Sequence, residues 1–203
     1  MEPAAAPLLP PVPPRAPCLS NLQLFLLVSV TTFLAVLLYL FLTRLKPADR
    51  PPLTRVSENI SITSQLTPRA LRYIRSHGIS TLVDVRPDGE APDQPSSTAI
   101  AEAARRYNVG FHYLPVPHET IPDSAINSLA QVLAKDNSST LLYCRTGRRA
   151  VRLLALAEAT RPDGPNLNEI LKLVRDAGFE ADDLRERLQQ RIATRANAAQ
   201  SKP

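Results

Sequence analysis

Cys144 has the clearest chemical potential in the sequence, because of the residues around it. An apolar run, 140–143, precedes the cysteine, and a short loop with one glycine and three arginines follows it. A strongly helix-forming segment, 150–159, comes next. The backbone N–H groups of such a loop can turn inward, and the N-terminus of the following helix adds partial positive charge. The sequence therefore predicts an anion-binding cradle that favours the thiolate of Cys144 over the thiol.

The loop itself supplies the other expected site residues. We expect Arg149 to act together with Cys144, because a guanidinium grips an oxyanion through two parallel hydrogen bonds. The residues expected to bind the anion or substrate are Arg145, Thr146, Gly147 and Arg148. The alternative interpretation is a buried structural cysteine beside solvent-exposed arginines. Three arginines next to a core cysteine argue against that alternative.

Two carboxylates, Asp123 and Asp88, are candidates for a general acid. Asp123 follows Pro122 in the first turn of a predicted helix, and Asp88 precedes Gly89 in a predicted turn. Each also has a structural interpretation, as a carboxylate at a helix N-terminus and as a turn residue, respectively. His118 is a further candidate proton donor on a predicted loop.

Three motifs, taken in order, resemble one protein family. They are Arg86-Pro87-Asp88-Gly89-Glu90, Gln94-Pro95-Ser96-Ser97 and Tyr143-Cys144-Arg145-Thr146-Gly147. Together they are similar to the phosphatase-like domain of beta-lactamase-hydrolase-like proteins, over about residues 60–188. The cysteine loop also resembles the loop of rhodanese-type sulfurtransferases. It looks like a shortened loop of the tyrosine and dual-specificity phosphatases, whose arginine comes six residues after the cysteine rather than five.

The resemblance implies an enzyme but leaves two reactions open. In the first, a sulfurtransferase, Cys144 takes sulfur from thiosulfate or a persulfide and passes it on from a cysteine persulfide. In the second, a phosphatase, Cys144 forms a phosphocysteine and a carboxylic acid protonates the leaving group. We expect sulfur transfer, because the shortened loop suits a smaller group than a phosphoryl group. A non-catalytic membrane-bound interaction module is a weaker alternative.

The pattern of apolar runs predicts an α/β fold, with a parallel sheet flanked by helices. Strands are expected at 60–62, 81–85, 111–116 and 140–143, and helices of about ten residues separate them. Thr67-Pro68 is expected to open the first of these helices, and a last helix is expected over 182–192. Ligands bind such sheets beyond the carboxyl ends of the strands, where Cys144 is expected to lie.

A run of 22 uncharged residues, Leu22 to Thr43, precedes this domain. At ~1.5 Å per residue, a helix of this length spans the ~30 Å hydrocarbon layer of a membrane. We expect an uncleaved single-pass anchor; a cleaved signal peptide is the alternative. Four basic residues follow the run at 44, 46, 50 and 55, and one precedes it at 15, so the positive-inside rule predicts a cytoplasmic catalytic domain.

These observations predict five segments along the chain. They are a disordered Pro-rich tail (1–20), a transmembrane helix (21–45), a Pro-rich linker (46–56), the catalytic domain (57–192) and a disordered tail (193–203). The chain has a net charge of +5, no Trp and no Cys/His cluster with metal-ligand spacing. We therefore expect no metal, no cofactor and no nucleic-acid partner. The expected partners are the lipid bilayer, through residues 21–45, and a small sulfur-containing anion or a phosphorylated substrate.

Overall fold

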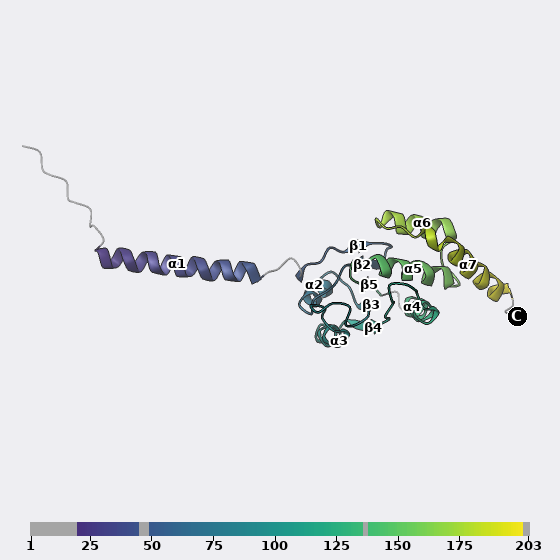
Figure 1. Cartoon of the computed structure of the whole chain (residues 1–203), viewed down its shortest axis with the longest axis horizontal. Helices are drawn as coiled ribbons and strands as arrows, with labels where there is room; N and C mark the ends of the chain where they lie inside the picture. The colour runs from purple at the N-terminus through teal and green to yellow at the C-terminus, as the bar shows by residue number, and fades with distance from the viewer. Residues whose placement is uncertain (1–19, 45–48, 136–137, 201–203) are drawn as a thin grey trace, which may run out of the picture. The chain divides into compact units, whose positions relative to one another are not determined.

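A computed structural model describes residues 20–44, 49–135 and 138–200 of the chain (Figure 1). The chain divides into two compact units, residues 1–45 and 46–203. Residues 1–19 of the predicted disordered tail and residues 46–48 of the predicted linker (46–56) lie outside the described residues.

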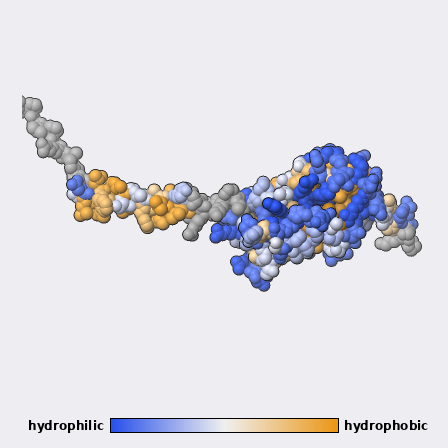
Figure 2. All heavy atoms as spheres, viewed as in Figure 1, coloured by the Kyte–Doolittle hydropathy of each residue, from blue (hydrophilic) through white to orange (hydrophobic). Residues whose placement is uncertain are grey.

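In the described part of the first unit, residues 20–44, the chain forms the helix α1 (Asn21–Arg44). Its segment Asn21–Leu40 is long and apolar enough to cross a membrane, and none of it is buried in the structure. Figure 2 shows hydrophobic residues along most of this helix. The hydroxyls of Thr31 and Thr32 donate to backbone carbonyls one turn earlier, so these polar groups are satisfied within the helix. A membrane span and a signal sequence would both have these properties.

The second unit is built on a five-stranded sheet with the order β1-β2-β5-β3-β4. The strands are β1 (Thr54–Arg55), β2 (Ile60–Thr63), β3 (Thr81–Asp84), β4 (Gly110–Tyr113) and β5 (Thr140–Tyr143). All neighbours pair in parallel except β1, which pairs antiparallel with β2 at the edge. The fully buried strands β3 and β5 lie in the middle, as expected for a sheet covered on both faces.

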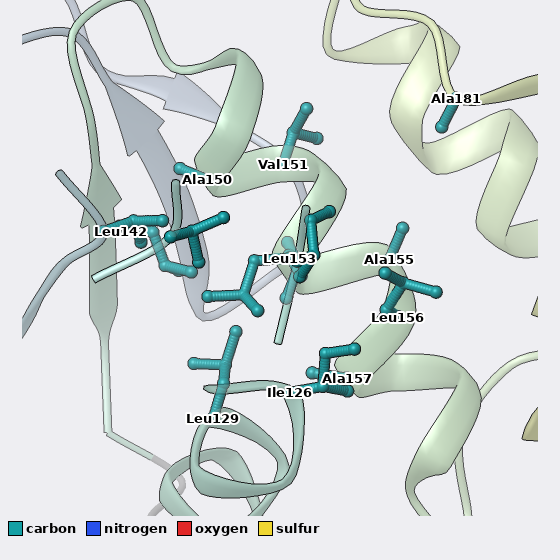
Figure 3. Close-up of a cluster of buried hydrophobic side chains, with 14 of the residues drawn as sticks. Ile126, Leu129, Leu142, Ala150, Val151, Leu153, Ala155, Leu156, Ala157 and Ala181 are labelled. Atoms are coloured by element: carbon teal, nitrogen blue, oxygen red, sulfur yellow. The ribbon is translucent and has the colours of Figure 1, made fainter. Parts of the chain in front are cut away.

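Helices cover both faces of the sheet, as the sequence predicts (Figure 1). The helices are α2 (Ala70–Ser76), α3 (Ser97–Arg106), α4 (Asp123–Lys135), α5 (Arg148–Thr160), α6 (Leu167–Asp176), the 3₁₀ turn η2 (Asp182–Leu184) and α7 (Arg185–Gln200). Side chains of α2 and α3 form one core with Leu82 and Leu141 of the sheet. The larger core lies on the other face, where Leu142 of β5, Leu153 of α5 and Leu129 of α4 point toward one another (Figure 3). Both cores lie wholly within the second unit.

Some predicted boundaries were wrong. The first helix of the domain begins at Ala70 and not at Thr67-Pro68, because Thr67 forms a separate turn and its hydroxyl bonds to Asp49. The last helix extends to Gln200, beyond the predicted end at residue 192 and into the predicted disordered tail. The side chain of Arg195 explains this extension, because it donates to three carbonyls at the end of α5 and in the loop that follows.

Candidate active site

The strand register brings the important loops to one edge of the sheet. The last residues of four adjacent strands are paired in register: Thr63, Tyr143, Asp84 and Tyr113. The chain segments that follow these strands therefore leave the sheet at the same edge. Cys144 follows the Tyr143 end directly, so the cysteine loop lies at this edge, as predicted, and the loop after β3 lies there too.

The cysteine loop folds tightly into the start of α5. Cys144 is buried, with 1% of its surface exposed. Gly147 is the N-cap of α5 and has a φ of +87°, a conformation that L side chains rarely adopt. A Cβ at Gly147 would also lie 3.0 Å from the side chains of Ile62 and Phe179. Glycine is therefore required at this position for the loop to pass between its neighbours.

The other loop residues divide into buried and exposed groups. Arg149 is buried in the first turn of α5, with 8% of its surface exposed. Arg145, Thr146 and Arg148 are exposed. The backbone carbonyl of Arg145 accepts from the amide of Gln65, which ties the loop to the segment after β2. The predicted anion-binding side chains thus lie at the rim, whereas Arg149 lies inside with Cys144.

A carboxylate, Glu90, holds the Arg149 guanidinium in place. Arg149 donates to both oxygens of Glu90, at 2.6 and 2.7 Å, and to the carbonyl of Val116 at 2.7 Å. Arg86, also buried, donates to Glu90 at 2.9 Å and to Gln65 at 2.7 Å. Sequence reasoning assigned no role to Glu90 or Arg86, although both belong to the motif that carries the family resemblance. The spacing Arg86-x-x-x-Glu90 is the only local signal of their pairing, because Arg149 is 59 residues from Glu90.

Charge pairing shifts the pKa values of this network. Hydrogen bonds from Arg149, and then from Arg86, lower the pKa of Glu90 to about 2, although partial burial opposes this shift. Burial acts to lower the pKa of Arg149, but Glu90 and the nearby Cys144 outweigh it, so that the pKa is raised. Arg149 is therefore a permanent cation beside the cysteine, which is what an anionic substrate requires.

Asp84, at the end of β3, is the second unusual carboxylate near this edge. Its side chain is buried and accepts from the backbone amide of Arg86 at 2.9 Å. Burial raises the pKa of Asp84 to about 6, and the hydrogen bonds to the carboxylate only partly offset this effect. The Asp84 carboxylate thus ties the end of β3 to the loop that follows it.

Both predicted acid candidates, Asp88 and Asp123, form hydrogen bonds or ion pairs with residues outside the cysteine loop. Asp88 accepts from the amide and the hydroxyl of Ser97, at 2.7 and 2.6 Å, at the start of α3. Asp123 is at the N-terminus of α4 and pairs with Arg187 and Arg191 of α7. Arg187 holds the pKa of Asp123 below its usual value, which favours the ionised form rather than a proton donor.

His118 lies closer to the Arg149 network than the sequence indicated. Its Nε2 is 3.7 Å from a carboxylate oxygen of Glu90, and its side chain is 68% exposed. The loop between β4 and α4 thus brings a titratable group to the same carboxylate that holds Arg149. No group of three or more metal-binding side chains occurs within the ranges that the structure describes.

A buried cysteine follows a central parallel strand, and an arginine lies in the first turn of the next helix; with the family match below, this arrangement marks the chain as a phosphatase-like enzyme. Residues 52–161 match the family described as "Beta-lactamase hydrolase-like protein, phosphatase-like domain". The chain belongs to this family.

Known proteins support this assignment. The beta-lactamase hydrolase-like protein of Xylella fastidiosa is 31% identical over 103 residues, which cover 51% of this chain and 24% of that protein. This chain thus spans about a quarter of the length of that curated relative. A crystal structure from Neisseria meningitidis, provisionally described as a phosphatase, is 30% identical with a TM-score of 0.58, over 68% of this chain and 96% of that one. The structure of Tk-PTP in its active form shares the fold, with 16% identity and a TM-score of 0.55, over 70% of this chain and 97% of Tk-PTP.

These comparisons favour one of the two predicted reactions, phosphate hydrolysis. The family and the Neisseria structure are both described as phosphatase-like, and they favour the predicted alternative, a phosphatase, over sulfur transfer. The predicted fold class is confirmed, and so is the resemblance to the family. The predicted preference for sulfur transfer rested on the short loop and on its resemblance to the sulfurtransferase loop, and these comparisons do not support it.

Proposed function

We propose that this chain is a cysteine-dependent phosphatase that acts through a phosphocysteine on Cys144. The observation that carries the proposal is the buried Arg149, fixed by Glu90 close to Cys144 in a phosphatase-like fold. The expected substrate is a phosphate monoester, because the fixed guanidinium and the loop amides suit a tetrahedral oxyanion.

The reaction proceeds in two displacements at phosphorus. The Cys144 thiolate attacks the phosphorus atom, an S–P bond forms, and the ester O–P bond breaks as the leaving oxygen accepts a proton. Water then attacks phosphorus, the S–P bond breaks, and inorganic phosphate leaves with the thiolate restored. Arg149 uses three of its five N–H groups on Glu90 and Val116, so two remain for the thiolate and the phosphoryl oxygens.

The proton for the leaving oxygen has a candidate donor in His118. It adjoins Glu90, whereas Asp123 and Asp88 are engaged by arginines and by Ser97. His118→Gln is expected to slow hydrolysis of an alkyl phosphate by ~10²-fold or more, the usual contribution of a general acid. An aryl phosphate should be much less affected, because a phenolate leaves without a proton. Equal slowing of both substrates would remove His118 from this role.

The test of the proposed function compares two reactions in the full-length protein in nanodiscs. We expect hydrolysis of an aryl phosphate, and Cys144→Ser should abolish it because the hydroxyl stays protonated at neutral pH. Arg149→Lys should lower kcat/KM by about 10²-fold, since an ammonium cannot replace a two-pronged guanidinium. Sulfur transfer from thiosulfate to cyanide is the second candidate, and the short loop between Cys144 and Arg149 favours it. Turnover of thiosulfate without hydrolysis of the phosphate would reverse the order of the two candidates.

The α1 segment is proposed to be an uncleaved single-pass anchor, with the enzyme domain on the cytoplasmic side. Its length, its hydropathy and the basic residues after it support this topology. Carbonate washing should leave the full-length protein in the membrane pellet. A reporter that works only in the cytoplasm, fused after residue 203, should be active. Recovery of a mature form cut near residue 45 would show that α1 is a signal sequence instead.

A further inference from the structure

One stretch of the enzyme domain has no negative charge. Residues 59–83 contain no Asp or Glu, but they contain three arginines and one histidine. The arginines are Arg69, Arg72 and Arg75, which lie three residues apart at the start of α2 and within it. Because three residues make almost one helical turn, the three side chains lie on one face. All three are exposed, and none forms an ion pair with a residue that the structure describes.

The opposite face of α2 fixes the direction of these arginines. Ala70, Leu71 and Ile74 are fully buried against the sheet, so the arginine face points to solvent. Tyr73 is half-buried beside it and stacks against the exposed His77, with ring centroids 4.0 Å apart. An exposed basic face with a neighbouring tyrosine has the composition of a surface that meets lipid headgroups.

The segment that connects α1 to the domain is hydrogen-bonded to residues next to α2. The Thr67 hydroxyl, just before α2, bonds to the Asp49 carboxylate at 3.2 Å. Close by, the Thr63 hydroxyl donates to the carbonyl of Pro52 at 2.7 Å. Four residues, 45–48, separate Asp49 from the end of α1 at Arg44. Five steps of ~3.8 Å between Cα atoms limit that separation to at most about 19 Å.

We propose that the arginine face of α2, made by Arg69, Arg72 and Arg75, docks on an anionic lipid bilayer. The inference rests on α1 being the anchor proposed above, because a spanning α1 would hold Asp49 within about two nanometres of the end of that helix, and Asp49 is bonded to Thr67, just before α2. Anionic headgroups attract arginines over roughly a Debye length, about 8 Å at physiological salt, and so short a tether keeps the arginines close enough to the surface to reach that range.

The direct test is arginine footprinting of the full-length protein in nanodiscs. An arginine-specific reagent such as phenylglyoxal is applied to discs of phosphatidylcholine alone and to discs with added phosphatidylserine. Arg69, Arg72 and Arg75 should be protected in the anionic discs only, and 0.5 M salt should remove the protection. The exposed Arg175 of α6 is the internal control and should react equally in both discs. Equal reactivity of the α2 arginines in both discs would overturn the proposal.

A binding measurement on the domain alone separates this proposal from the anchor and from catalysis. Residues 49–200 contain both cores, and the Neisseria structure covers this domain with 96% of its own chain, so the domain folds without α1. Each arginine near an anionic surface contributes about five-fold in binding. The variant Arg69→Gln/Arg72→Gln should therefore bind phosphatidylserine vesicles about 25-fold more weakly, and the matched variant Lys135→Gln/Arg175→Gln should bind normally. An equal loss in both variants would refute the proposal, as would protection of α2 by polyglutamate or RNA but not by lipid.

Discussion

Replacing Glu90 by glutamine should reveal how strongly the Arg149 network is held. The substitution keeps the shape of the side chain but removes the charge that Arg149 and Arg86 share. The Arg149 guanidinium lowers the pKa of the Glu90 carboxyl group from its ordinary value of 4.5 to about 2 on folding. At ~1.4 kcal/mol per pKa unit, the ionised form gains about 3 kcal/mol. The side chain is 16% exposed, and screening through this exposed part reduces the expected loss in Glu90→Gln to about 2 to 3 kcal/mol.

The pH dependence of unfolding tests this reasoning. A carboxylate with a lowered pKa in the folded state stabilises the protein fully above its unfolded pKa of 4.5. The contribution is lost as the pH falls from 4.5 through about 2. Urea unfolding of the wild type and of Glu90→Gln should therefore differ by about 2 to 3 kcal/mol at pH 6, and the two should converge toward pH 2. The exposed Glu119, on the neighbouring loop, provides the matched control Glu119→Gln, which should change stability by less than about 0.5 kcal/mol. A constant difference at all pH values would refute the electrostatic account of this network.

Three further substitutions test individual parts of the site. Gly147→Ala should destabilise the protein by about 2 kcal/mol in urea unfolding and lower turnover, because the left-handed backbone and the close neighbours exclude a Cβ; wild-type stability would contradict the loop geometry. Asp84→Asn should stabilise the protein at pH 7 by about 2 to 3 kcal/mol, because the raised pKa of about 6 destabilises the ionised form increasingly as the pH rises from 3.8 through 6; below pH 4 the variant and the wild type should agree. Asp123→Asn should lower kcat/KM for an alkyl phosphate by much less than the ~10²-fold expected for the loss of a general acid. A loss of that size would restore Asp123 to the mechanism.

The parts of the site that could be predicted from the sequence are those encoded locally. The strand before Cys144, the glycine in its loop and the helix after it are adjacent in the chain, so their spacing alone predicts the cradle. The same holds for the capping of α3 by Ser96 and of α6 by Asn166, where a side chain bonds to an amide three residues later.

The long-range pairs could not be predicted in this way. Glu90 reaches Arg149 across 59 residues, and its charge alone does not distinguish it from any exposed loop glutamate. Asp123 was a candidate acid because its ion-pair partners on α7 could not be recognised from the sequence. These partners, Arg187 and Arg191, come more than 60 residues later. The extension of α7 has the same cause, since Arg195 is stabilised by carbonyls of distant residues rather than by its own helix.

Trapping the covalent intermediate tests the central claim most directly. The full-length protein is mixed with an aryl phosphate, quenched in acid within a fraction of the turnover time, and digested for mass spectrometry. We expect the peptide that contains Cys144 to carry one phosphoryl group, which should be absent from Cys144→Ser. Thiosulfate, in a parallel sample, should leave Cys144 without added sulfur. A persulfide on Cys144 after thiosulfate, with no phosphoryl group after the aryl phosphate, would contradict the phosphatase mechanism.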